Sequence, residues 1–389
     1  MQAPVLQAHK KLYGLDHLRA FAICYVLLYH YRLFGHPDWV PVLAGFGWSG
    51  VDLFFVLSGY LISSHLFAEL SKTGTISLKT YFIKRSFRIL PAYLFIVAVY
   101  FLVPAYHERE ALSPLWRFLT FTKNFGLDMK AEGTFSHSWS LCVEEQFYLV
   151  LPMVLLALAY YKTGKKGLLL LGGLFLAGFF TRWYGWQLIA PFVEDDSFRV
   201  LHHKYIYYPT YNRLDPLLIG IAVSALYHYR PAFSVKIMKA ANWLIPLAML
   251  VLIAAYYLSE NEASIISVVF GYPVVALGYG LLVMAAVHPA SVLYRYRSGL
   301  TEKIATLSYS LYLSHKGLMP LTQRLIEPYG FDPNSNITML VCFIVVVAAA
   351  VLLHVVVEKP FMRMRDRVLK RKTQAPVKPR YFSPATKSV

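Results

Sequence analysis

A succession of apolar segments, each about twenty residues long, constrains this chain more than any other feature of its sequence. In lipid every backbone polar group must be bonded within the protein, so a segment of this length crosses the ~30 Å hydrocarbon core as an α-helix. We place ten such segments at 15–34, 46–68, 89–105, 137–161, 167–186, 211–229, 241–258, 264–287, 304–326 and 336–357. The sequence therefore predicts an all-α fold, a polytopic membrane helical bundle of about ten transmembrane helices.

Composition excludes the common soluble classes of protein. Hydrophobic residues make up 57% of the 389 residues, which is too apolar for a soluble enzyme and ordinary for a membrane protein with several spans. The formal net charge of +17 raises nucleic acid as a partner, but that function needs a basic face on a soluble domain, and none is evident. The three cysteines lack metal-ligand or disulfide spacing. We therefore expect no nucleic-acid partner, no metal, and the lipid bilayer as the surrounding medium.

Positive charge sets the expected orientation. Lysines and arginines concentrate in alternate loops and near both termini, which is the pattern of cytoplasmic segments. We therefore expect both termini in the cytoplasm. Residues 1–365 form the predicted membrane domain, and residues 366–389 form a basic cytoplasmic tail that we expect to be disordered. Asp16 and Arg19 interrupt the first apolar run and no small-residue cleavage site follows, so we interpret it as a retained span and not as a signal peptide.

Arg19 and His30 are an ionisable pair within the first apolar segment. Eleven residues at ~100° per residue return to within about 20° of the starting direction, so both side chains share one helical face, ~16 Å apart along its axis. Ionisable groups at such depth usually face a bundle interior or a wet cavity. Alternatively, Arg19 anchors the helix at the interface and His30 bonds a neighbouring helix. For the pair on a single face we favour a functional role.

Asp52 lies about two turns into the next apolar segment, at a depth comparable to that of His30. We expect the two side chains to pair, because a carboxylate on one imidazole nitrogen fixes the tautomer and makes the other nitrogen more basic. Such a pair suits a general base. The alternative is an interhelical hydrogen bond that only stabilises the bundle.

Three cations, Lys84, Arg85 and Arg88, precede the third apolar segment. Arg85 and Arg88 are three residues apart, and we expect them on one side of the turn that starts this helix. A helix N-terminus with two guanidinium groups is a good phosphate site. Basic residues at an inner membrane edge also serve as topology anchors, so the signal is weak when taken alone.

Further ionisable side chains lie in the remaining segments. Glu144 and Glu145 lie about two turns into one span, and adjacent residues point ~100° apart, so at most one of the two is expected to reach a shared cavity. Arg213 and Asp215 are expected to neutralise each other at an outer helix end. The other candidates, on the acceptor side or in a structural role, are Trp139, Tyr309 and His315. This many polar groups at matched depths indicates an aqueous site in the bundle.

The same residues carry a resemblance to a known family. The Arg19–His30 spacing and the stretches GVDLFFVLSGYLI, KRSFRILPAY, SWSLCVEEQFY, YNRLDPLLIG, SYSLYLSHKG and VEKPF resemble, in order, the motifs of the acyltransferase-3 family of integral membrane acyltransferases. The resemblance covers residues 12–365. It implies transfer of an acyl group, usually acetyl from cytoplasmic acetyl-CoA as co-substrate with no bound cofactor, to a hydroxyl of an extracytoplasmic glycan or glycolipid. Typical acceptors are polysaccharide, lipopolysaccharide and peptidoglycan. The implied location is the bacterial inner (cytoplasmic) membrane.

On the donor side, the resemblance and the residues together give a specific hypothesis. The phosphates of the acyl-CoA are expected at the inner mouth against Arg85 and Arg88, with Lys84 nearby. The thioester arm then reaches up past Arg19, which holds the donor or only balances charge.

On the acceptor side, His30 is expected to take the proton of the acceptor hydroxyl as its oxygen attacks the thioester carbonyl. Asp52 or Glu144 is expected to orient the imidazole. A covalent acyl-histidine or acyl-serine intermediate is an open variant of this scheme.

Two alternatives stay open at the level of sequence. Some family members carry a fused extracytoplasmic hydrolase-like domain that completes transfer, and this chain shows none, so either the membrane core transfers directly or a separate periplasmic acyl-accepting protein is a partner. The rival function is a proton-coupled transporter or flippase of a glycolipid or anionic metabolite, which would use the same buried charges as a substrate path. Inverted repeats would favour that rival, and we find none. A structural scaffold explains the basic inner face but not the buried ionisable groups.

Overall fold

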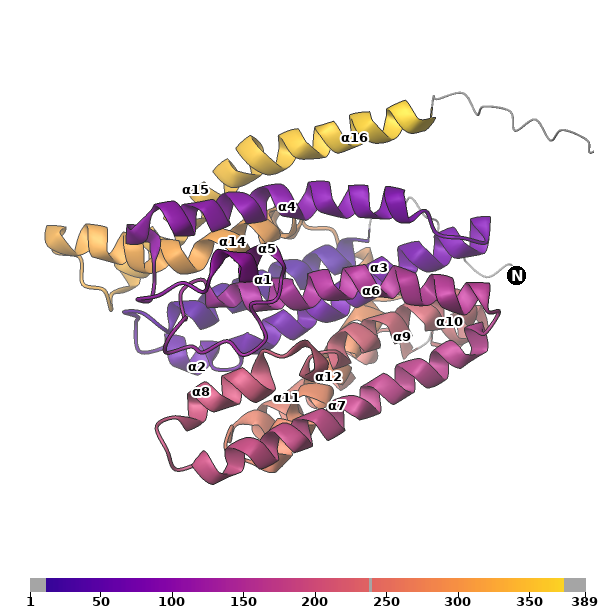
Figure 1. Ribbon diagram of the computed structural model, residues 1–389, viewed down its shortest axis with the longest axis horizontal. Coiled ribbons are helices and arrows are strands. Elements are labelled where there is room, and N and C mark those ends of the chain that lie inside the picture. Colours follow the sequence, from indigo (N-terminus) through magenta and orange to yellow (C-terminus); the bar gives the residue numbers. More distant parts are fainter. Residues whose placement is uncertain (1–11, 238–239, 374–389) are drawn as a thin grey trace, which may run out of the picture.

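The computed structural model describes residues 12–237 and 240–373 of the 389-residue chain. Every regular element within these residues is a helix, as expected, and the long helices run side by side as a bundle (Figure 1). The long helices are α1 (Tyr13–Tyr31), α3 (Gly50–Thr73), α4 (Leu78–Leu102), α6 (Trp139–Tyr160), α7 (Gly167–Ile189), α9 (Asp215–Tyr229), α11 (Leu244–Ser259), α12 (Tyr272–Val287), α14 (Gly299–Ile326), α15 (Asn336–Leu353) and α16 (Lys359–Thr373). Short helices connect them: α2 (Val40–Ala44), α5 (Leu115–Leu119), α8 (Phe198–His202), α10 (Pro231–Ile237) and α13 (Val292–Arg295).

Each of the apolar segments overlaps one long helix between α1 and α15. Among the described residues, six helical stretches are long and apolar enough to cross a membrane, and they contain α3, α4, α6, α7, α12 and α15. Polar side chains lower the hydropathy of α1 and α14, while α9 and α11 have only 15 and 16 residues. The chain is a multi-pass membrane protein. The count of about ten spans and the cytoplasmic location of both termini remain predictions.

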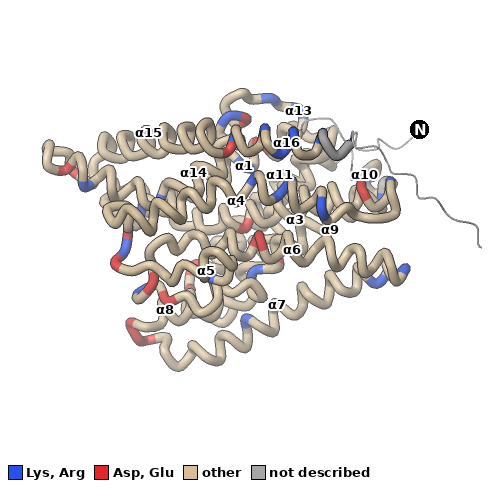
Figure 2. Tube along the Cα trace, turned by 45° about the horizontal axis from the view of Figure 1, so that its top comes forward, with Lys and Arg blue, Asp and Glu red and all other residues tan. Residues whose placement is uncertain are grey.

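The charged residues concentrate toward the two ends of the bundle. In Figure 2, blue residues are frequent around α10, α13 and α16, with some red among them, and red residues are frequent around α8, with some blue among them. This division agrees with the excess of positive charge expected on the cytoplasmic side.

Helix α4 begins earlier than the apolar segment that predicted it. It starts at Leu78, where the Ser77 side chain accepts a hydrogen bond from the backbone N–H of Thr80, a standard N-cap. Arg85 and Arg88 therefore lie inside the helix, and the expectation that they flank its N-terminus is wrong. The apolar segment marks only the part of the helix with high hydropathy, whereas the helix itself continues through the basic turns before it.

Helices α3 and α9 approach each other through two glycines. A Cβ atom at Gly59 would lie 2.2 Å from the Leu217 carbonyl oxygen, and one at Gly220 would lie 2.2 Å from that of Val56. Only glycine permits such backbone contact between helices, which is how small residues drive helix association in membranes. This crossing fixes α3, and with it Asp52 and Ser58, against α9.

Helix α16 continues α15 through a π-helical turn at His354–Glu358 and packs beside α4 (Figure 1). Residues 366–373 of the basic tail were expected to be disordered, and they are helical. They extend a helix that has already formed and are rich in residues that favour helices. The remainder of the expected tail, 374–389, lies outside the described residues.

Candidate active site

A cavity of about 200 Å³ lies between α1, α3, α4, α6 and α14. Guanidinium and carboxylate groups line it from three of these helices: Arg19, Arg85, Arg88, Glu144 and Glu145. Tyr309 of α14 lines it as well. The structure thus gathers five of the predicted site residues, Arg19, Arg85, Arg88, Glu144 and Tyr309, whereas Lys84 is exposed and does not line the cavity. Glu145 lines it as well, so the expectation that at most one of the two glutamates reaches a shared cavity is wrong.

The two arginines of α4 line the same cavity as Glu144 and Glu145 but form no close ion pair with either carboxylate in the described part of the chain. Within the described residues, neither Arg85 nor Arg88 forms an ion pair, and the Arg85 guanidinium instead lies 5.0 Å from the centre of the Tyr148 ring. Arg19 differs, since its Nη1 is 3.4 Å from Asp16 Oδ1. Arg85 is partly buried and Arg88 is exposed, and together with Arg19 they outnumber the two carboxylates that line the cavity. The cavity therefore suits an anionic ligand, and the fork geometry of arginine favours phosphate.

A chain of hydrogen bonds crosses the cavity wall between α6 and α3. The Tyr148 hydroxyl donates to Ser58 Oγ at 3.0 Å, and Ser58 Oγ donates to Glu144 Oε1 at 2.7 Å. Glu144 is thereby tied to Ser58, and it does not contact His30. The expectation that Glu144 orients the His30 imidazole is not met, because its carboxylate already has a hydroxyl donor in the neighbouring helix.

Three histidines form a second cluster near the end of α1. His30 Nδ1 lies 2.9 Å from His315 Nε2 of α14, and the His137 ring centre is 4.9 Å from that of His315 and 6.0 Å from that of His30. His315 is fully buried, His137 is 2% exposed, and His30 is only partly buried. His30 therefore presents the accessible side of the cluster. In the described part of the chain, no group of His, Cys, Asp or Glu side chains has the arrangement of a metal site.

A buried lysine adjoins this cluster. Lys316 Nζ donates to Ser136 Oγ and lies 3.6 Å from Glu108 Oε1. The carboxylate neutralises the ammonium group, so the histidine cluster has one fixed ion pair beside it. Both ring nitrogens of the adjacent His137 lack a hydrogen-bond partner among the described residues.

Tyr312 of α14 joins the cavity to the histidine cluster. Its ring lines the cavity and lies 5.6 Å from the His137 ring and 5.8 Å from the His315 ring, measured between centres. Its hydroxyl is 2.6 Å from Ser140 Oγ and donates to the His137 backbone carbonyl at 2.9 Å. Two hydrogen bonds thus hold this ring between the two polar regions.

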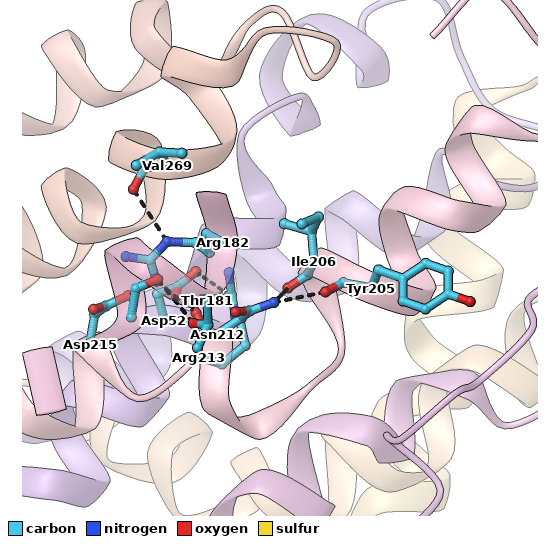
Figure 3. A network of polar contacts seen from close by, with 10 residues as sticks. Asp52, Thr181, Arg182, Tyr205, Ile206, Asn212, Arg213, Asp215 and Val269 are labelled. Carbon is cyan, nitrogen blue, oxygen red and sulfur yellow. Dashed lines mark hydrogen bonds and ion pairs between the residues drawn. The ribbon is translucent and has the colours of Figure 1, made fainter. Parts of the chain in front are cut away.

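Asp52 pairs with Arg213, and the predicted Asp52–His30 pair does not form. Arg213 Nη2 donates to both carboxylate oxygens of Asp52, at 2.8 and 2.9 Å, and both side chains are fully buried (Figure 3). A carboxylate gains more from a charge-assisted bond with a guanidinium group than from a neutral imidazole. Asp52 also lies in the first turn of α3, which begins at Gly50, and so it is closer to the helix N-terminus than the two turns that the apolar segment 46–68 indicated.

Arg213 was expected to neutralise Asp215, and this expectation is wrong. Asp215 pairs instead with Arg182 of α7. Arg182 also donates to the backbone carbonyls of Val269 and Asn212, at 3.2 and 2.9 Å (Figure 3). Arg213 precedes α9, whereas Asp215 is the first residue of that helix, so their side chains leave the chain in different directions.

Aromatic rings enclose the Arg213 guanidinium. Its central carbon lies 4.4 Å from the centre of the Tyr272 ring, 4.8 Å from that of Tyr207 and 5.5 Å from that of Trp139. Cation–π contacts and the Asp52 pair together replace the water that this cation loses. Arg213 and Asp215 therefore lie in packed ion pairs and do not line the cavity, and Trp139 packs between Arg213 and the cavity residue Phe55.

Sequence reasoning passed over four residues that the structure places in these networks: Arg182, His137, Tyr148 and Tyr312. Arg182 carried a clear signal, since it is a lone cation within the apolar segment 167–186. His137 was visible at the start of the segment 137–161. The tyrosines carried no distinguishing signal, because the chain has 29 of them and most serve packing or the interface.

A histidine cluster beside a cavity lined by guanidinium and carboxylate groups within a helical bundle fits a membrane transferase, and comparison with known proteins identifies the family. The acyltransferase domain family of type 3 matches residues 12–355. This chain belongs to that family, a class of acyltransferase enzymes, as its motifs indicated.

Particular relatives extend the comparison. O-acetyltransferase OatA of Staphylococcus aureus, strain NCTC 8325 / PS 47, is 28% identical over 322 residues, which is 78% of this chain and 49% of the relative. OatA from strains COL and MRSA252 matches with the same identity and coverage. The chain thus spans about half the length of the curated relatives it matches. No solved structure matches the chain at a significant level.

Proposed function

We propose that this chain is an inner-membrane O-acyltransferase that moves an acetyl group from cytoplasmic acetyl-CoA to a hydroxyl of an extracytoplasmic glycan or glycolipid. The observation that carries the proposal is the arrangement of the cavity, with two unpaired guanidinium groups, next to a histidine cluster whose accessible member is His30. The family and its O-acetyltransferase relatives support the reaction class.

The donor binds through its phosphates. Arg85 and Arg88 face the cavity from adjacent turns of α4 and supply forked donors for two phosphate groups. Arg19 adds a third cation, partly neutralised by Asp16. The thioester arm then extends along the cavity toward Tyr312.

The chemical step needs one general base. His30 Nε2 takes the proton of the acceptor hydroxyl, the hydroxyl oxygen forms a bond to the thioester carbonyl carbon, and the carbon–sulfur bond breaks. The departing thiolate then takes the proton from His30 Nε2. The products are the O-acetyl ester and free coenzyme A, and the histidine returns to its neutral form.

Tyr312 separates the two substrates. Its ring lines the cavity and also lies near the His137 and His315 rings, so we place it on the path that the thioester takes from the cavity to His30. An enzyme that joins a cytoplasmic donor to an outer acceptor needs such a barrier, because an open path would admit water to the thioester.

The test uses purified full-length protein in lipid nanodiscs, [¹⁴C]acetyl-CoA, and the surface glycan fraction of cells from which the gene has been deleted. Wild-type protein should form a base-labile labelled ester on the glycan. His30→Ala should lower the rate about 100- to 10,000-fold, the usual contribution of a general base. The matched control is His36→Ala, since His36 lies outside the cluster and its side chain bonds the Pro37 carbonyl of its own loop. Undiminished labelling by His30→Ala would refute the role of His30, and vesicle transport without ester formation would favour a transporter.

A further inference from the structure

We infer that His315 positions His30 for catalysis by fixing its tautomer, so that His30 Nε2 faces the acceptor as the unprotonated nitrogen. This inference rests on the proposed function, since it assigns the group that orients the general base. It replaces the carboxylate expected in that place with a second imidazole.

The hydrogen on His315 can be located from its neighbours. His315 Nδ1 lies 2.8 Å from the Tyr312 carbonyl oxygen and 3.1 Å from that of Leu311, both on the preceding turn of α14. Carbonyl oxygens only accept hydrogen bonds, so Nδ1 is the nitrogen that carries hydrogen. A neutral imidazole has one N–H group, which leaves His315 Nε2 as an acceptor.

The neutral form of His315 follows from its surroundings. The ring is fully buried and the adjacent Lys316 is 3% exposed. The carboxylate of Glu108 is already paired with Lys316. A second proton on His315 would therefore add a buried cation beside an ammonium group with no carboxylate of its own.

The tautomer of His30 is then determined. Its Nδ1 lies 2.9 Å from His315 Nε2, and because that nitrogen accepts, His30 Nδ1 donates. The single hydrogen of neutral His30 is thus on Nδ1, and Nε2 keeps its lone pair. A directed chain runs from the backbone of α14 through His315 to His30. It performs the orienting role that a carboxylate performs in other catalytic dyads.

A purely structural role makes a different prediction. The His30–His315 bond also links α1 to α14, and a structural bond of this kind would affect folding without changing kcat per folded molecule. The chain offers a matched control, because Gln323 Nε2 of α14 donates to the neighbouring Tyr31 hydroxyl of α1 at 3.0 Å, also in a buried position. Gln323→Leu removes a bond between the same two helices and leaves the histidines in place.

The experiment compares His315→Leu, His315→Gln and Gln323→Leu in nanodiscs. For each variant, kcat and the KM for [¹⁴C]acetyl-CoA are measured with the isolated surface glycan as acceptor, and rates are normalised to the amount of folded protein. Glutamine keeps an acceptor oxygen near the position of Nε2, whereas leucine has none. We expect His315→Leu to lower kcat about 100-fold or more, within the range of general-base effects, with KM changed about twofold or less. His315→Gln should recover kcat about tenfold over leucine, and Gln323→Leu should keep near-wild-type kcat.

Equal kcat values for the leucine and glutamine variants, or a kcat for His315→Leu that matches Gln323→Leu, would overturn the inference. His315→Met, which fills a similar volume and offers the imidazole N–H only a weak sulfur acceptor, takes the place of the leucine variant if that chain does not fold. Failure of the proposed function can be distinguished from failure of this inference, because in that case even the wild-type protein would form no glycan ester.

Discussion

Arg213 donates from a single guanidinium nitrogen to both carboxylate oxygens of Asp52, at 2.8 and 2.9 Å, and so ties the first turn of α3 to the chain entering α9. Both partners are fully buried. The same two helices meet at Gly59 and Gly220 further along, so the ion pair and the glycine contact together fix their crossing. Asp52 is therefore held by an arginine and not by His30, the proposed general base.

Removing one member of this pair should destabilise the protein. Asp52→Asn or Arg213→Gln leaves an uncompensated buried charge, which costs about 3–5 kcal/mol, whereas the double variant removes both charges and should cost less than the sum. Thermal unfolding of the nanodisc-bound protein measures the loss. Activity per folded molecule should fall far less than in His30→Ala. If Asp52→Asn unfolded at the wild-type temperature while losing activity 100-fold, Asp52 would belong to the acid–base machinery after all.

The arginines of α4 should control donor affinity. Arg85→Gln or Arg88→Gln removes a charge-assisted bond to phosphate worth about 1.5–3 kcal/mol, so the Kd for coenzyme A should rise about 10- to 100-fold. The adjacent Lys84→Gln is the control, because Lys84 is exposed and does not line the cavity. Isothermal titration with coenzyme A measures all three. A loss of affinity that is the same for Lys84→Gln would indicate general surface charge and not a phosphate site.

Much of the bundle could be predicted from the sequence because the bilayer constrains it strongly. Every apolar segment overlaps a helix, since a chain in lipid has few other ways to bond its backbone. The start of α4 could not be found in this way, because hydropathy falls where Arg85 and Arg88 begin, although the helix continues to its cap at Ser77. Helix ends in water depend on caps, which hydropathy does not detect.

The site could be predicted in its members but not in its pairings. Arg19, Arg85 and Arg88 line one cavity, and Glu144, which was expected beside His30 on the acceptor side, lines it with them. Depth along a helix does not determine which face of one helix meets which face of another. The expected pairings of Asp52 and Asp215 were wrong because an arginine from another segment takes each carboxylate. The expected contact of Glu144 with His30 was wrong because Ser58 donates to that carboxylate.

The glycine contact between α3 and α9 should tolerate no side chain. Gly59→Ala places a Cβ atom 2.2 Å from the Leu217 carbonyl oxygen, so the helices must separate; overpacking of this kind costs about 1–3 kcal/mol or more. The control is Gly172→Ala in α7, where nothing lies within 4 Å of the new atom. Alanine there should leave the unfolding temperature unchanged or raise it, because it favours the helix by up to about 1 kcal/mol. Equal unfolding temperatures for the two variants would contradict the close approach.

The Tyr312 ring should act as a barrier between donor and water. Tyr312→Ala removes the ring that lies between the cavity and the His137 and His315 rings, and water from the acceptor side then reaches the thioester. We expect hydrolysis of acetyl-CoA without acceptor to rise several-fold, measured as free thiol released. Tyr312→Phe is the control, since it loses the bonds to Ser140 and the His137 carbonyl but keeps the ring. Its hydrolysis rate should stay near that of wild type. If alanine and phenylalanine gave the same low rate, the ring would not separate the two substrates, and the thioester would reach His30 by another path.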